Sequence, residues 1–411
     1  MKYYLVGIKG SGMSALACYL KDLGNTVLGS DVNQNFDFES GLIKRNIEVL
    51  LFSKNNIKPN YVYIIGNAYR LENEEVQEII KNGYKYYYYH EYISTLPGIK
   101  IGVSGTHGKT TTSYFLKEML RDESIACIIG DGTGFAVDNY QYLIYEACEY
   151  QDHFLSYRPD ILIITNIDYD HPDYFKDINQ TIDSFYKASL NSKEVVTLSK
   201  INYQIKEINN LFSKVIIDDE EYVLNIIGIH NIYNFILCYK TLKLLGFDNQ
   251  YIKEKAKSLK LPTRRMEETR INDLILVEDY GHHPTEINAL YNTLNIKYPN
   301  YPKIVIFQPH TYSRTIALIE EFISSLSKFD EVYIDKVFTS KREPYNVELE
   351  VLIQYHFKCF KKYKDFNQDL LKQKVLIILL GAGDVNRRFK KYYLNNENIF
   401  IFSWKNKNIG V

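Results

Sequence analysis

The sequence predicts an α/β protein of two or three domains, and three observations support this prediction. A chain of 411 residues is too long for one ordinary hydrophobic core. Apolar strands alternate with amphipathic helices over most of its length, as in βα repeats around a mainly parallel sheet. Glycine-rich turns join a strand to a helix near Gly10 and again near Gly105, and such turns are typical of nucleotide-binding folds.

Composition and charge describe a soluble globular protein. Hydrophobic residues make up 45% of the sequence, and 49 basic residues nearly balance 50 acidic ones, so no basic excess favours nucleic acid. Apolar runs such as 375–380 are too short to span a bilayer, and the N-terminus has no signal-peptide pattern. We therefore expect no membrane insertion and a cytoplasmic location. The five cysteines are widely spaced, which argues against a disulfide framework.

The first strand, turn and helix occupy residues 3–24 and carry the sequence GSGMSA at positions 10–15. This sequence fits G-x-G-x-x-A, and Asp31 ends the next strand about 20 residues on, where a dinucleotide fold places its ribose-binding acid. A plain βα turn fits the same pattern, and the pattern does not say which nucleotide binds. Further βα alternation over 61–82 completes a small doubly wound sheet, with a boundary at 96–98.

A second α/β domain begins with a candidate phosphate-binding loop. A buried strand at 100–104 leads into the glycine-rich loop Gly105–Thr110, and a helical pattern starts at Thr111. Backbone N–H groups in such a loop bind phosphate, assisted by the helix N-terminus. Lys109 would reach the outer phosphates, and the Thr110 hydroxyl would ligate Mg²⁺. Valine at position 103 excludes the longer GxxxxGK[ST] motif, so the match is to G-x-x-G-K-T.

Polar residues at the ends of the next strands are candidates for a cation site. Glu146 ends the strand in QYLIYE, and His171 follows the strand DILIIT at 160–165. Both lie where open α/β sheets bind ligands, so both could face Mg²⁺ near Thr110. Each also has an ordinary interpretation, as a polar strand end for Glu146 and as a turn for His171. Mg²⁺ prefers oxygen ligands, so a histidine in its shell is an unusual proposal.

The helix that follows Gly228 begins with His230, Asn231 and Asn234. His230 and Asn234 share one face because they are four residues apart. Two amides and an imidazole at the start of a helix suit hydrogen bonding to the edge of a nucleotide base. Helix capping by Asn231 explains the same residues equally well.

A third βα segment follows Leu261-Pro262 and carries polar side chains at its strand ends. These residues are Asp279, Tyr280, His282, His283, His310 and Arg314. Adjacent residues on an extended segment point apart, and no nearby carboxylate or thiolate completes a tetrahedron around His282 and His283. The sequence therefore predicts no zinc site at this histidine pair.

Taken in order, these motifs resemble those of the Mur ligases of cell-wall synthesis. They are GIKGSGMSA, GTHGKTTT, EACEY, TNIDYDHPDYF, GIHNIYN, RRME, EDYGHHPTEI and FQPHTYSRT, and they cover the chain from Gly7 to Asp384. Within the family, GSGMSA, EDYGHHPTEI and FQPHTYSRT are most similar to the branch that joins L-alanine to UDP-N-acetylmuramate. Eight motifs in one order argue strongly against a chance match.

The resemblance implies three domains and a reaction. Residues 1–97 would be a Rossmann-like domain for the UDP substrate, 98–262 a central P-loop ATPase-type domain that binds ATP, and 263–411 a C-terminal Rossmann-like domain that closes over the active site. ATP would phosphorylate the lactyl carboxylate of UDP-N-acetylmuramate, and the amine of L-alanine would attack the acyl phosphate. The implied cofactors are ATP and two Mg²⁺ ions, and the implied assembly is a monomer or homodimer.

The resemblance also implies a role for each motif residue. Residues that would bind ATP are Gly105, Thr106, His107, Gly108, Lys109, Thr110, Thr111, His230, Asn231, Asn234 and Arg265. Thr110 and Glu146 would hold one Mg²⁺ and His171 a second. The catalytic group would comprise Lys109, His282, His310 and Arg314. The UDP substrate would contact Gly10, Ser11, Gly12, Asp31 and Tyr280.

Two positions depart from the family pattern, and three other functions stay open. Thr311 stands where many relatives carry arginine, and Phe235 replaces a small residue after the second asparagine. An NAD(P)-dependent oxidoreductase built on the Gly10–Asp31 element would leave the ATP loop unexplained. A non-catalytic nucleotide-binding module would not need the intact phosphate loop and cation residues. A related ligase could attach a ready-made peptide to recycled muramyl precursors.

Overall fold

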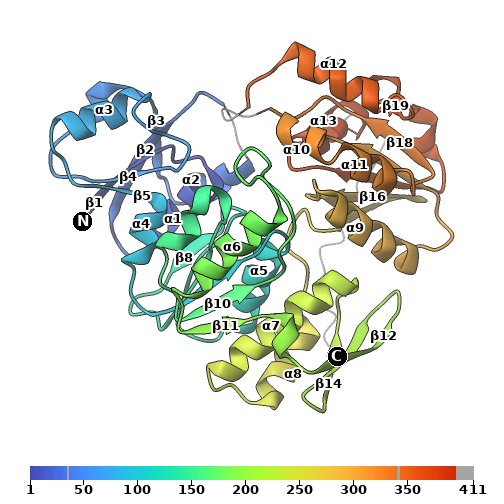
Figure 1. The fold of residues 1–411 in the computed structure, drawn as a ribbon, viewed down its shortest axis with the longest axis horizontal. Coiled ribbons are helices and arrows are strands. Elements are labelled where there is room, and N and C mark those ends of the chain that lie inside the picture. The colour runs from blue at the N-terminus through green and yellow to red at the C-terminus, as the bar shows by residue number, and fades with distance from the viewer. Residues whose placement is uncertain (35–36, 340–342, 395–411) are drawn as a thin grey trace.

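The computed structural model describes residues 1–34, 37–339 and 343–394. Within these ranges the chain forms four β-sheets with helices packed around them (Figure 1). Three sheets are mainly parallel and follow one another along the chain, which confirms the predicted α/β class. We refer to the parts around these three sheets as the N-terminal, middle and C-terminal units.

The N-terminal unit contains a parallel sheet of strand order β3-β2-β1-β4-β5. Its strands are β1 (Lys2–Val6), β2 (Thr26–Asp31), β3 (Glu48–Leu51), β4 (Val62–Ile65) and β5 (Tyr86–Tyr88). Its helices are α1 (Ser11–Asp22), α2 (Ser40–Lys44), α3 (Glu74–Lys81) and α4 (Tyr89–Ser94). The strand order reverses between β1 and β4, where doubly wound sheets bind ligands, and the predicted glycine turn follows β1 at this point.

The middle unit contains a six-stranded sheet of order β11-β10-β6-β9-β7-β8. Its strands are β6 (Ile99–Ser104), β7 (Ile125–Ile128), β8 (Gly134–Ala136), β9 (Tyr142–Glu146), β10 (Ile161–Ile164) and β11 (Glu194–Val196). Its helices are α5 (Lys109–Met119), α6 (Ile178–Ser189), α7 (Ile229–Leu244) and α8 (Asn249–Ser258). All strands except β8 run parallel, so the ends of β6, β9 and β10 meet at one edge and bring their polar residues together.

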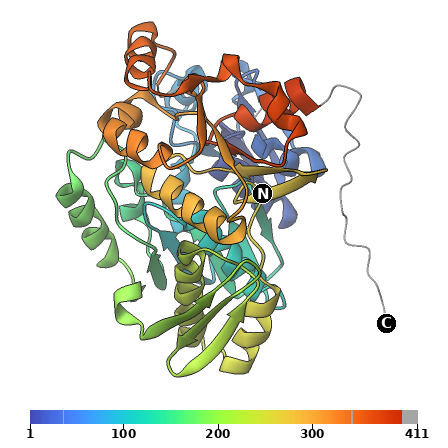
Figure 2. The same ribbon diagram turned by 90° about the vertical axis from the view of Figure 1, so that its right-hand side faces the viewer.

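A small antiparallel sheet, which the sequence analysis did not predict, extends from one end of the middle unit (Figures 1 and 2). Its strands are β12 (Tyr203–Ile208), β13 (Ser213–Ile217) and β14 (Glu220–Leu224). Asp218 and Asp219 form the two-residue turn between β13 and β14, with positive φ angles of 47° and 67°. Positive φ at both turn residues is the conformation that matches the twist of a tight hairpin.

The C-terminal unit contains a six-stranded sheet of order β15-β16-β20-β17-β18-β19. Its strands are β15 (Glu267–Ile271), β16 (Leu274–Asp279), β17 (Lys303–Phe307), β18 (Glu331–Ile334), β19 (Lys361–Lys362) and β20 (Leu376–Leu380). Its helices are α9 (Pro284–Lys297), α10 (Tyr312–Ala317), α11 (Ile319–Leu326), α12 (Val347–His356) and α13 (Val385–Phe389). The all-apolar β20 is buried at every position, because helices cover both faces of a parallel sheet.

The N-terminal and middle units share one hydrophobic core. Leu16 of α1 and Leu143 of β9 belong to the same buried cluster, and the Tyr19 and Tyr140 hydroxyls are hydrogen-bonded at 2.7 Å. Strand β8 approaches α1 so closely that a Cβ on Gly134 would lie 1.8 Å from the Ala15 carbonyl oxygen. Only glycine fits at that position. The C-terminal unit has separate buried clusters on its own sheet.

No helix in the described ranges is long and apolar enough to cross a lipid bilayer.

Candidate active site

The phosphate loop connects β6 to α5 at the polar edge of the middle sheet. Gly105 has φ +132°, and a Cβ there would lie 1.9 Å from Thr165 Oγ1. Gly108 has φ +81°, and a Cβ there would lie 2.7 Å from Asn234 Oδ1. Both positions therefore require glycine. Because Gly108 is the N-cap residue, α5 begins at Lys109, two residues before the predicted start, and its free N–H groups face outward for an anion.

Lys109 is bound to an acid that the sequence analysis did not select. Its Nζ donates hydrogen bonds to the two carboxylate oxygens of Glu149 at 3.1 and 3.0 Å, and to the carbonyl oxygens of Gly105 and Thr106. Burial alone would lower the pKa of Lys109, but the Glu149 charge raises it. Glu149 is only 1% exposed. The signal available in the sequence was the second acid of EACEY, just beyond the end of β9.

The predicted cation residues lie around this lysine. Burial raises the pKa of Glu146, against the opposing effects of the Gly130 amide, the Lys109 charge and a hydrogen bond with the Thr110 hydroxyl. Thr110 and Glu146 therefore offer adjacent oxygen donors, which is the donor set that Mg²⁺ prefers. His171 Nε2 lies 3.7 Å from Glu149 Oε1, so Glu149 links the Lys109 ammonium to the second predicted cation residue.

A cavity of about 440 Å³ opens beside the phosphate loop, between the middle and C-terminal units. Among the predicted ATP-binding residues, its lining includes His107, Gly108, Thr111, His230, Asn231, Asn234 and Arg265. Burial, together with the Arg265 charge, lowers the pKa of His230 to about 4, so this imidazole is neutral at pH 7. The Asn231 amide donates to the Ile227 carbonyl at 2.8 Å rather than capping α7, whose N-cap is Gly228. Phe235 is buried in the middle-unit core.

The predicted catalytic residues of the C-terminal unit are joined to the middle unit by a buried ion pair. Arg314 Nε and Nη2 donate to the two Asp170 carboxylate oxygens at 2.6 and 3.0 Å. The remaining amino group of Arg314 contacts His310 at its carbonyl oxygen and at Nδ1. Burial would raise the pKa of Asp170, but the guanidinium holds it well below its usual range. Asp170 is thus a second functional candidate that the sequence analysis missed.

His282 and Tyr280 occupy the same side of the site. His282 Nδ1 donates to the Tyr280 carbonyl at 3.0 Å, and its ring lies 5.6 Å from that of His310. Burial, with the Arg314 charge, lowers the pKa of His282 to about 4. Tyr280 lines a second cavity of about 140 Å³ together with Phe38, Thr110 and Gly130. This cavity adjoins all three units, because Phe38 belongs to the N-terminal unit.

The predicted UDP-binding residues form a separate group at the ends of β1 and β2. Gly10 is the N-cap of α1, and Ser11 and Gly12 are its first residues. The Asp31 carboxylate is 4% exposed and accepts hydrogen bonds from the Lys9 and Val32 amides and from the Tyr69 hydroxyl. Through the bond to the Lys9 amide, the Asp31 carboxylate holds the glycine turn after β1 against the end of β2.

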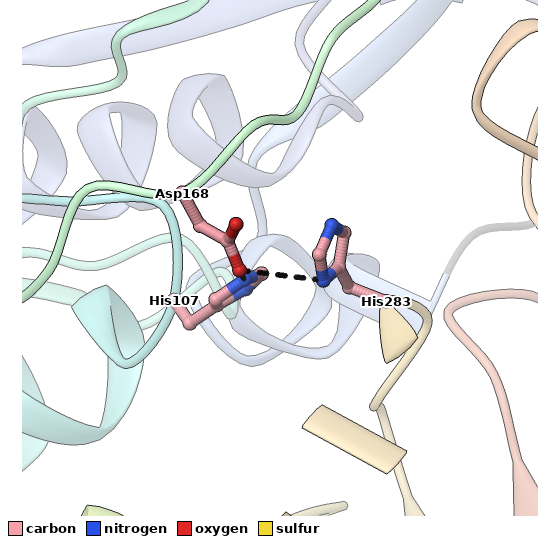
Figure 3. A group of neighbouring side chains, drawn as sticks. All are labelled: His107, Asp168 and His283. Carbon is pink, nitrogen blue, oxygen red and sulfur yellow. Dashed lines mark hydrogen bonds and ion pairs between the residues drawn. The ribbon is translucent and has the colours of Figure 1, made fainter. Parts of the chain in front are cut away.

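The structure corrects the prediction that no carboxylate lies near the paired histidines. Asp168 Oδ2 is 3.8 Å from His283 Nδ1 and 3.3 Å from His107 Nε2 (Figure 3). The phosphate loop and the loop after β10, which are distant in sequence, bring these side chains to His283. The Thr106 hydroxyl holds the second loop by bonding to the Asp168 backbone. His282 points elsewhere, as the sequence predicts.

His107 is a charged link between two carboxylates in this group. Its Nε2 faces Asp168, and its Nδ1 lies 3.6 Å from Glu286 Oε1 of the C-terminal unit. Burial would lower the pKa of His107, but its hydrogen bonds to Asp168 and Glu286 outweigh that effect and raise the pKa to about 9. At pH 7 the imidazolium therefore joins the middle and C-terminal units.

Known solved structures share this fold. A UDP-N-acetylmuramate–alanine ligase, MurC, from Thermotoga maritima is 24% identical and superposes with a TM-score of 0.79 over 96% of this chain and 99% of that one. A murein peptide ligase from Psychrobacter arcticus is 18% identical, with a TM-score of 0.68 over 96% and 99%. MurF ligase from Thermotoga maritima in complex with ADP is 14% identical, with a TM-score of 0.62 over 84% and 96%.

Family models match the chain in three consecutive stretches. Residues 2–97 match the Mur ligase family catalytic domain, 103–188 the Mur ligase middle domain, and 264–383 the Mur ligase glutamate ligase domain. The three matches occur in the order of the three α/β units, and the segments between them that no model covers are 98–102 and 189–263. This chain therefore belongs to the Mur ligase family.

Proposed function

We propose that the chain joins L-alanine to the lactyl carboxylate of UDP-N-acetylmuramate at the expense of ATP, in the synthesis of peptidoglycan precursors. Ligases of this family use ATP, and family membership favours a ligase over an oxidoreductase or a passive nucleotide-binding module. One observation carries the proposal. Glu149 contacts both Lys109 and His171 beside Thr110 and Glu146, and this group would make one cradle for a triphosphate and its cations.

The chemistry requires an activated carboxylate. A free carboxylate is a poor acyl donor because its leaving group would be oxide, whereas an acyl phosphate releases phosphate. Transfer of the γ-phosphoryl group depends mainly on positioning and on neutralising charge. The Lys109 ammonium and the N–H groups at the start of α5 supply fixed positive charge for that step. A nucleophilic side chain is not required.

The proposed cation residues suit magnesium. Thr110 and Glu146 would hold one Mg²⁺ through oxygen donors, and His171 with Glu149 would hold a second. Bound there, Mg²⁺ would offset the negative charge of the transferring phosphoryl group. The second Mg²⁺ would then be the partner of the buried Glu149 carboxylate when Lys109 leaves it to bind a phosphate.

The substrates would approach from opposite sides of the phosphate loop. The 440 Å³ cavity with His230, Asn234 and Arg265 would hold the base of ATP, and the smaller cavity under Tyr280 would receive the muramoyl end of the UDP substrate. Gly10, Ser11, Gly12 and Asp31 would fix the UDP end. His282, His310 and Arg314 would surround the carboxylate and the incoming amine. The domains of the proposal remain 1–97, 98–262 and 263–411.

The test is a phosphate-release assay with purified protein, ATP, Mg²⁺ and UDP-N-acetylmuramate. A panel of single amino acids is compared with the peptide L-alanyl-γ-D-glutamyl-meso-diaminopimelate. Release that depends on L-alanine supports the proposal. Release that depends on the peptide alone would assign the chain to the recycling ligases, to which its fold is also similar. If neither the amino acids nor the peptide stimulates phosphate release, both the alanine-ligase and the peptide-ligase assignments are overturned.

A further inference from the structure

His107, Asp168 and His283 form a cluster of side chains of metal-ligating type (Figure 3). They come from the phosphate loop, the loop after β10 and the N-cap of α9. One donor atom from each residue lies within 4.8 Å of the other two. Asp168 Oδ2 is 3.3 Å from His107 Nε2 and 3.8 Å from His283 Nδ1. Donor atoms bound tetrahedrally to Zn²⁺ are about 3.3 Å apart, given bond lengths near 2.0 Å.

The hydrogen bonds of His283 show which of its ring nitrogens could bind a metal. Its Nε2 lies 3.2 Å from the Tyr169 carbonyl oxygen, which only accepts, so Nε2 carries the proton. Nδ1 therefore has the lone pair, and it accepts a long 3.3 Å bond from the Thr285 amide. His107 Nε2–H donates a hydrogen bond to Asp168 when no metal is bound, so a divalent cation would bind by displacing that proton, and its bond to Nδ1 would replace that of the Thr285 amide.

The cluster also has outer partners and a route to solvent. The Thr285 hydroxyl donates to Asp168 Oδ2 at 2.7 Å, and the Tyr169 carbonyl orients the His283 ring, which is how metal-binding carboxylates and imidazoles are usually held. The His283 side chain is 4% exposed and that of His107 12%, but Asp168 is 36% exposed. Asp168, His107 and Thr285 line the 440 Å³ cavity, which leaves room for a water as fourth ligand.

We propose that His107, Asp168 and His283 bind a borderline divalent cation of the Zn²⁺ class, at a site distinct from the Thr110–Glu146 position. Two imidazoles and one carboxylate suit Zn²⁺, whereas Mg²⁺ takes oxygen donors. Since His283 belongs to the C-terminal unit and the other two ligands to the middle unit, the cation ties these units together. An enzyme that must open to release its products is inhibited by such a tie.

The site is tested with the full-length chain, freed of metals by EDTA, and with Co²⁺ as a spectroscopic probe. We expect one Co²⁺ per chain with the strong visible absorption of a four-coordinate ion, and displacement of that ion by Zn²⁺. His283→Gln and Asp168→Asn should each weaken Zn²⁺ binding at least tenfold, or about 1.4 kcal/mol. His356→Gln changes an exposed histidine at the end of α12 and should leave Zn²⁺ affinity unchanged.

A Glu146→Gln variant separates this site from the proposed Mg²⁺ position. Retention of the Co²⁺ absorption in this variant supports the proposal, and its loss there would overturn it. Unchanged Zn²⁺ affinity in both His283→Gln and Asp168→Asn would overturn it as well. Melting curves show which variants fold. If His283→Gln does not fold, the more exposed Asp168→Asn decides the outcome. Limited proteolysis measures the tie between the units. Zn²⁺ should protect the 261–264 segment from cleavage in the wild type and should not protect it in Asp168→Asn.

Discussion

Glu149 holds the Lys109 ammonium through both of its carboxylate oxygens, at 3.1 and 3.0 Å. Glu149 is buried and Lys109 is partly buried, and Glu149 also lies 3.7 Å from His171 Nε2. A phosphate that binds to Lys109 must therefore compete with a carboxylate inside the protein. A divalent cation near His171 would draw the same carboxylate away. Under the proposed function, Glu149 would therefore couple nucleotide binding to cation binding through one side chain.

Replacement of Glu149 by glutamine should have opposite effects on the two ligands. Without the carboxylate, Lys109 is free for phosphate, so the affinity for ADP in the presence of EDTA should rise about tenfold, or about 1.4 kcal/mol. The affinity for Mn²⁺, measured by electron paramagnetic resonance, should fall because a negative oxygen donor is lost. Titration calorimetry measures the ADP affinity. The neighbouring Cys148→Ser serves as control, and equal affinities in all three proteins would remove Glu149 from the coupling.

Lys109→Ala should abolish ADP formation and leave the binding of UDP-N-acetylmuramate measurable. The lysine supplies the charge for the phosphoryl group, whereas the proposed UDP residues Gly10–Gly12 and Asp31 lie in the N-terminal unit. Coupled-enzyme detection of ADP and calorimetric binding of UDP-N-acetylmuramate test the two halves of this prediction. Retained turnover in the variant would disprove the phosphate-loop assignment.

Arg314→Ala should slow acyl-phosphate formation at least tenfold, or about 1.4 kcal/mol in activation free energy. The guanidinium forms a buried two-point pair with Asp170 and contacts His310, so its loss removes the main positive charge beside a buried carboxylate. Single-turnover rates of Arg314→Ala, Asp170→Asn and the double variant form a cycle, in which we expect strong non-additivity. The exposed Arg121→Ala is the control, and an unchanged rate in Arg314→Ala would exclude the residue from the mechanism.

His107 should make stability fall as the pH rises. Its pKa is about 9 in the folded protein against an ordinary value of 6.5, so the folded state binds the proton more tightly. The stabilisation is complete below pH 6.5 and is lost as the pH rises through about 9. Between these pH values the free energy of unfolding falls by at most about 1.4 kcal/mol per pH unit. Urea unfolding of wild type and His107→Gln at several pH values measures the difference, and parallel curves would contradict the assignment.

The sequence predicted the parallel sheets because their strands are buried on both faces. Strands β6, β10 and β20 read as short apolar runs between turn residues. The antiparallel sheet was not predicted because β12 is half exposed and a bulge between Ile205 and Glu207 interrupts its alternation of polar and apolar residues. Its one clear signal was the Asp218-Asp219 pair at the turn.

The residues of the candidate site also differ in how far a local sequence pattern could predict them. Lys109, Thr110 and Glu146 could be predicted because each stands next to a strand end within a short motif. Glu149 and Asp170 could not, because their roles come from pairs with Lys109 and Arg314, which are 40 and 144 residues away along the chain. The carboxylate beside His283 was missed for the same reason. Charge pairing between distant loops leaves no local pattern in a sequence.

The boundary between the middle and C-terminal units is held mainly by polar contacts, with the Tyr169 ring packed against the C-terminal core. The first two units share a continuous apolar interior, so they should move as a single body. Along the boundary between the middle and C-terminal units, water can replace these hydrogen bonds one by one as the boundary opens. We expect the third unit to swing about 261–264 at small cost, which would let reactants enter and product escape without loosening either neighbour.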